Sequence, residues 1–174
     1  MKLLRPTLAL MIVVAVASMA QAQTGVRGTG RTVAVPPNPQ ALAALQTDLV
    51  NAIESMKSAL PIYDGNRVHS IRAAHEALII VDHAISGANA MKRQVPNVKD
   101  QVSSGQAHTQ YTAQQIAASQ ASMRKGYAAL QQAYKDLQAA AGSNPNAKAL
   151  KVNAHLQTAG TEATKAIAIH AAQG

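Results

Sequence analysis

The sequence predicts an all-α protein: an alanine-rich, antiparallel four-helix bundle that follows a cleaved signal peptide and a disordered N-terminal tether. Alanine, which has the highest intrinsic helix propensity, dominates the chain after the leader, and alternating β-branched runs are missing outside Val33-Ala34-Val35. Apolar residues recur every three or four positions in several long segments, as in amphipathic helices. Mostly short joints between these segments favour antiparallel neighbours.

Residues 1–22 have the features of a secretory signal peptide. Lys2 and Arg5 give a positive start, residues 8–17 are nearly all apolar, and Ala20-Gln21-Ala22 fits the A-x-A cleavage pattern. The apolar run is shorter than the roughly 20 residues of a membrane-spanning helix. We therefore expect a periplasmic or secreted protein that begins at Gln23 and has no transmembrane span after processing.

Composition narrows the classes of function. The chain contains no cysteine, so a disulfide, a thiol nucleophile, a lipid anchor and covalent haem attachment all lack their sulfur. The part after the leader has 14 Lys and Arg against 8 Asp and Glu, a net charge of 14 − 8 = +6, but these cations are scattered and Phe and Trp are absent. This pattern argues against nucleic-acid binding. The net positive charge is still sufficient for a weak attraction to anionic polymers of the cell envelope.

The domain is expected to span residues 38–174, after a flexible tether at 23–37. Asn38-Pro39 reads as a helix cap followed by proline at the first helical position, and Ser143-Asn144-Pro145 repeats that signal before the last helix. In the stretch 94–109, Pro96-Asn97 indicates a break and a fresh cap, and Asp100 favours a short helical turn before Gly105. The expected helices lie at about 38–60, 66–87, 110–141 and 145–172.

The third expected helix carries the clearest apolar seam. The first two apolar residues of this seam are seven positions apart, and the following ones are alternately four and three positions apart, as in a coiled coil. Gln120 lies within the seam. Such a narrow stripe suits either the domain's own core or a second copy of the chain, so a homo-oligomer through this helix stays open. The seam residues are Ile116, Met123, Tyr127, Leu130, Tyr134, Leu137 and Ala141.

Three histidines lie within residues 67–86. At 100° per residue, His75 falls on the apolar face with Asp82, while His69 and His83 fall together on a polar face. A metal held by one helix needs ligands three or four positions apart, because seven positions rise about 10.5 Å. We expect His75 to be buried and neutral, with a tyrosine, Asp82 or water as its hydrogen-bond partner.

A metal site between helices is the alternative. If the second and fourth helices run parallel on a diagonal, His75 and His155 lie at similar depths, with Asp82 and Glu162 each seven residues later. Two histidines per level leave a first-row metal short of ligands. No metal site is therefore expected; if there is one, its ligands are these four residues.

Helix geometry also makes haem binding unexpected. The periplasmic b-type four-helix cytochromes use a Met from the first helix and a His near the end of the last, and Met56 and His170 lie on apolar faces here. An antiparallel pairing of the first and last helices would separate them by roughly 25 Å. Met56 is expected in the core, and no cofactor is expected.

One short motif carries a family resemblance. Tyr111-Thr112-Ala113-Gln114-Gln115 resembles the Leu-Thr-x-x-Gln motif of small periplasmic helical chaperones, which implies sheltering of unfolded clients. Catalytic signatures are lacking, since there is no glycine-rich phosphate loop and no pair of carboxylates at short spacing. The sequence thus predicts an exported, non-enzymatic bundle that binds or scaffolds a protein or polymer in the cell envelope, with a metal-binding or chaperone-like bundle as alternatives.

Overall fold

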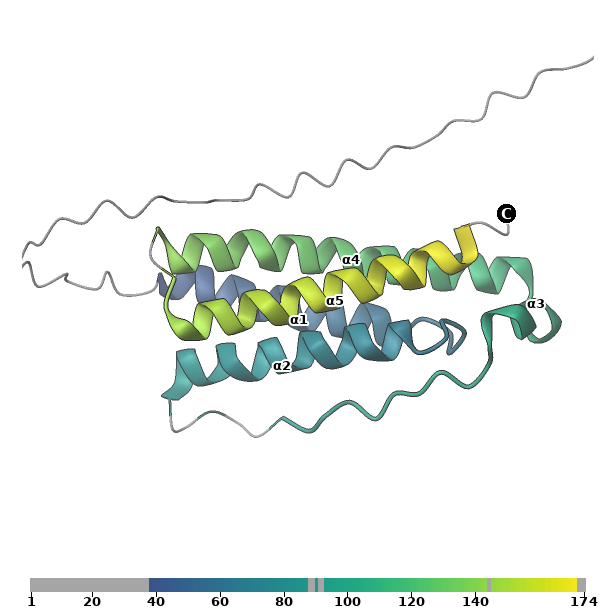
Figure 1. Ribbon diagram of the computed structural model, residues 1–174, viewed down its shortest axis with the longest axis horizontal. Coiled ribbons are helices and arrows are strands. Elements are labelled where there is room, and N and C mark those ends of the chain that lie inside the picture. Colours follow the sequence, from purple (N-terminus) through teal and green to yellow (C-terminus); the bar gives the residue numbers. More distant parts are fainter. Residues whose placement is uncertain (1–37, 88–89, 91–92, 144, 172–174) are drawn as a thin grey trace, which may run out of the picture. The chain divides into compact units, whose positions relative to one another are not determined.

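Four long helices account for most of the residues that the computed structural model describes, which are 38–87, 90, 93–143 and 145–171 (Figure 1). No strand occurs in this part of the chain, so the all-α prediction is confirmed. The expected leader and tether lie outside the described residues. The elements are α1 (Pro39–Lys57), α2 (Asn66–Ser86), the 3-10 turn η2 (Ser104–Gln106), α3 (Ala107–Gln110), α4 (Ala113–Ala141) and α5 (Ala147–Ala171).

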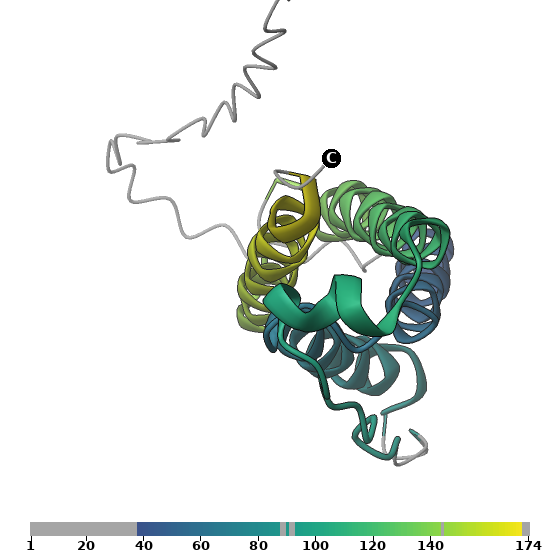
Figure 2. The same ribbon diagram turned by 90° about the vertical axis from the view of Figure 1, so that its right-hand side faces the viewer.

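The long helices surround one hydrophobic core. Helix α1 packs against α2 and α4, and α5 packs against the same two helices, an arrangement compatible with a helical bundle (Figure 2). The expectation that the second and fourth helices lie on a diagonal is wrong, because α2 and α5 are direct neighbours. The physical reason is the connection after α2. It is long, and it returns along the outside of the helices to α3 at the opposite end (Figure 1).

Side-chain caps fix where the helices begin. Asn38 Oδ1 accepts hydrogen bonds from the backbone of Gln40 (3.0 Å) and Ala41 (3.4 Å) with proline at the start of α1, as expected. The predicted start of the last helix is wrong by about two residues. Asn146 Oδ1 accepts from Ala149 N at 2.9 Å, so Asn146 caps α5 in place of Asn144.

Helix α4 begins with a capping box. Thr112 Oγ1 accepts from Gln115 N (3.2 Å), and Gln115 Oε1 accepts from Thr112 N (2.8 Å). The T-x-x-Q pattern that carries the chaperone resemblance therefore has a local structural role: two backbone N–H groups at the start of the helix find partners.

The seam of α4 is buried along its seven-residue step, at Ile116, Met123, Leu130 and Leu137. Its second row differs from the prediction. Small residues fill that row, whereas Tyr127 is half-buried and Tyr134 is exposed. The small residues are Ser119, Gly126, Ala133 and Ala140.

Residues 93–103, called the crossover here, contain no helix or strand. The predicted helical turn at Asp100 is wrong, and the helical residues begin only at Ser104. Asp100 serves another purpose, since its carboxylate binds Arg67 of α2. No described helix is both long and apolar enough to cross a membrane.

Candidate functional site

The imidazole of His75 is buried and lacks a partner. The residue is 3% exposed, and neither Nδ1 nor Nε2 has a hydrogen-bond partner among the described residues. The expected burial is confirmed, as is the exposure of His69 and His83 on another face. The expected bond to a tyrosine or to Asp82 is wrong, and water, the third expected partner, stays a prediction. An unpaired buried polar group costs about 1–3 kcal/mol, so this arrangement lowers stability.

Asp82 is occupied by other groups. Its Oδ1 accepts from Gln46 Nε2 of α1 at 2.6 Å, and both of its oxygens accept from the guanidinium of Arg93 in the crossover. This ion pair holds one end of the crossover against α2. Asp82 does not serve His75 because the two residues lie seven positions apart on the same helix, a rise of about 10.5 Å.

A pocket of about 400 Å³ lies beside His75. Helices α1 and α2 form its walls, and crossover residues 93–97 form its third side. Its apolar lining comes from Val50, Ile53, Leu78, Val95 and Pro96, and its polar lining from Glu54, Lys57, His75, Arg93, Gln94 and Asn97. The volume falls within the roughly 300–1,000 Å³ that small-molecule sites occupy.

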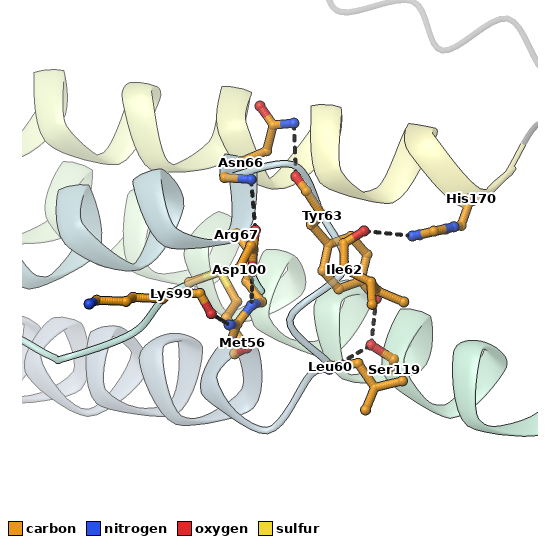
Figure 3. A network of polar contacts seen from close by, with 11 residues as sticks. Met56, Leu60, Ile62, Tyr63, Asn66, Arg67, Lys99, Asp100, Ser119 and His170 are labelled. Atoms are coloured by element: carbon orange, nitrogen blue, oxygen red, sulfur yellow. Dashed lines mark hydrogen bonds and ion pairs between the residues drawn. The ribbon is translucent and has the colours of Figure 1, made fainter. Parts of the chain in front are cut away.

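A buried ion pair holds the other end of the crossover (Figure 3). Arg67 Nε donates to Asp100 Oδ1 at 2.9 Å, and the two side chains are 4% and 6% exposed. Arg67 Nη2 donates to the carbonyl of Lys99 (3.0 Å), and Gly65 N donates to Asp100 Oδ2 (2.8 Å). These bonds supply partners for both buried charges, as a buried ion pair requires.

A second cluster of polar side chains lies where α1 ends (Figure 3). Ser119 Oγ of α4 lies 2.7 Å from the hydroxyl of Tyr63 and accepts from Leu60 N at 2.8 Å. His170 Nε2 of α5 lies 3.0 Å from the carbonyl of Ile62, so it is the donor, and the imidazole packs edge-on against Tyr63 at 5.3 Å between ring centres. Burial raises the pKa of Tyr63 above its ordinary value. These contacts tie α4 and α5 to the α1–α2 turn.

This position of His170 corrects the argument against haem. His170 was expected near the start of α1, but it contacts Ile62 and Tyr63, which follow the end of that helix. Met56 is nevertheless a core residue, as expected: it is fully buried and its sulfur accepts from Ser70 Oγ at 3.1 Å.

The four residues named for a metal site do not meet. Asp82 is bound as described, Glu162 pairs with Lys165 of its own helix at 2.6 Å, and His155 is half-buried on α5. Among the described residues, no three His, Asp or Glu side chains lie close enough together to hold a metal ion.

One carboxylate pair escaped the sequence analysis because its members lie on different helices. Asp48 of α1 lies beside Asp136 of α4: partial burial of Asp48 and, after it, the neighbouring side chain and charge of Asp136 raise the pKa of Asp48. The spacing of 88 positions gives no signal in a single sequence.

Comparison with known proteins adds no assignment: no family model matches the chain, and neither a curated protein nor a solved structure is significantly similar to it.

Proposed function

We propose that this protein is an exported, non-enzymatic helical bundle that acts as a binding or scaffolding module in the cell envelope. One observation carries the proposal: among the residues that the structure describes, buried His75 has no hydrogen-bond partner, and it lies beside a ligand-sized pocket. Unpaired buried polar groups are rare in folded proteins because they cost stability, and a functional site is one place where they are kept.

The proposal includes the finer architecture. The four long helices form an antiparallel four-helix bundle with one long crossover, a known variant of bundle topology. Residues 1–22 form the signal peptide that directs export, and residues 23–37 form a tether. Because the crossover lies outside the helices and is anchored at Arg93 and Asp100, it can border a site while the four helices keep their packing.

The ion pairs support a non-enzymatic role. The most deeply buried carboxylates described, Asp82 and Asp100, each accept hydrogen bonds from an arginine that holds the crossover in place. A general acid or base needs a titratable group that is free to exchange a proton and is oriented by a partner. The two carboxylates are engaged in structure, and His75 has no orienting carboxylate among the described residues.

The test is to express the full chain, separate envelope and cytoplasmic fractions, and record native mass spectra of the protein. The proposal predicts a mature protein that begins at Gln23, is found in the exported fraction and carries a bound molecule that the His75→Leu variant lacks. Retention of residues 1–22 in the cytoplasm would refute export. An identical bound fraction in wild type and variant would refute the binding site.

A further inference from the structure

The lining of the His75 pocket offers more hydrogen-bond donors than acceptors. Arg93 uses Nε and Nη2 on Asp82, so the N–H groups of its Nη1 have no described acceptor. Lys57 Nζ donates one of its three N–H groups to Glu54 Oε1 at 2.8 Å, which leaves two for a ligand. That same bond engages the carboxylate of Glu54, which is the one acidic group of the lining.

His75 adds a buried donor to the lining. A neutral imidazole has one N–H and one acceptor nitrogen, and here neither has a partner among the described residues. A ligand oxygen that accepts from this N–H would remove the cost of burying it unpaired. Around the imidazole, Ile53 and Leu78 are buried apolar residues, and Val50, Val95 and Pro96 extend the apolar lining toward solvent.

Resting on the binding role proposed above, we propose that this pocket binds a small amphipathic carboxylate. Its carboxylate group accepts hydrogen bonds from His75, Arg93 and Lys57, and its hydrocarbon part lies against the apolar lining. Such charge-assisted bonds are about twice as strong as neutral ones, which favours the acid over its uncharged amide or alcohol.

The crossover sets access to the site. Both ring nitrogens of His75 are covered, so a ligand reaches them only when a wall of the pocket shifts, and residues 93–97 are the one wall that is not part of a helix. In the described part of residues 94–99, the backbone makes a local turn bond from Val98 N to Pro96 O (3.0 Å) and accepts one from Arg67 at Lys99 O. The segment can therefore move between its two anchors with little loss of hydrogen bonding.

The test is calorimetric titration of the protein, expressed as the full chain, with octanoate, octanamide and octan-1-ol at neutral pH. We expect octanoate to bind at least tenfold more tightly than the other two. We expect His75→Leu to raise the Kd for octanoate at least tenfold, and the matched variant His155→Leu, which changes a half-buried histidine outside the pocket, to leave it unchanged. Circular dichroism melts check that both variants fold.

Three results overturn the inference: octanamide equal to octanoate, octanoate binding unaffected by His75→Leu, or no binding of any of the three probes. The proposed function is still supported after such a result if a different molecule copurifies with the exported wild-type protein and does not copurify with the His75→Leu variant. Conversely, selective octanoate binding by a protein that stays uncleaved in the cytoplasm supports the pocket and refutes export.

Discussion

Gly126 of α4 lies so close to Met56 of α1 that a Cβ at position 126 would be 2.5 Å from Met56 Cγ and 3.1 Å from the carbonyl oxygen of Ala52. This is the point at which the two helix backbones have no room for a side chain. The row of small residues on α4 therefore sets the spacing of the α1–α4 pair.

Gly126→Ala is expected to destabilise the protein by about 1–3 kcal/mol, the usual cost of overpacking a core, despite the higher helix propensity of alanine. Gly160→Ala is the matched control, because its added Cβ would meet only Tyr127 Cε2 at 3.9 Å, an ordinary contact. The free energy of unfolding of the Gly160→Ala variant should rise by up to about 1 kcal/mol, because alanine has a higher helix propensity than glycine. Urea unfolding measures both; equal effects of the two changes would contradict the close approach.

The Arg67–Asp100 pair should stabilise the protein through the crossover. Asp100→Asn leaves a buried guanidinium without its counter-charge, so we expect a loss of about 3–5 kcal/mol in the free energy of unfolding. Glu54→Gln, which breaks the exposed Lys57–Glu54 pair, should change it by less than about 1 kcal/mol. The two are compared in one denaturant series, and a mild effect of Asp100→Asn would show that the crossover is held by other contacts.

The Asp48–Asp136 pair should give a distinct dependence of stability on pH. Folding raises the pKa of Asp48, so the folded state favours the protonated acid. The stability that this shift contributes is fully present below the unfolded pKa and is lost as the pH rises through the folded pKa. Asp136→Asn removes the neighbouring charge, so it should raise the melting temperature at pH 7 more than at pH 3. The same shift at both pH values would rule out the carboxylate pair as the cause.

The metal alternative has a direct test in thermal melts with and without Zn²⁺, Cu²⁺ or Ni²⁺. A ligand that binds only the folded protein must raise its melting temperature. Because His75, His155, Asp82 and Glu162 do not converge among the described residues, we expect no shift at equimolar metal. A rise that His75→Ala or His155→Ala abolishes would restore the metal site.

Large apolar residues made much of this fold predictable. Leu45, Leu49, Ile53 and Met56 on α1 lie buried as their spacing predicts, and the phase of His75 relative to His69 and His83 is correct. Small residues were missed because Gly126 and Ser119 bear no apolar signal, although they face the core. Their role depends on the helix that packs against them.

The candidate site was predictable only in part. Burial of His75 follows from helical periodicity, but the pocket needs the crossover, whose course is set by ion pairs between distant residues. Arg67 and Asp100 are 33 positions apart and Asp82 and Arg93 are 11 apart, and nothing in their spacing marks them as partners. The Pro96-Asn97 pair signals a turn, and a local turn bond does join Val98 N to Pro96 O, but no helix follows before Ser104.

The stability of His75→Leu without ligand tests the central claim most directly. If His75 is kept for binding, leucine of similar size removes two unpaired buried nitrogens, and the free energy of unfolding should rise by about 1–2 kcal/mol. His155→Leu, at a half-buried position, should change it little. A loss of 2 kcal/mol or more in His75→Leu, measured by urea unfolding, would mean that the imidazole stabilises the fold itself and would contradict the account.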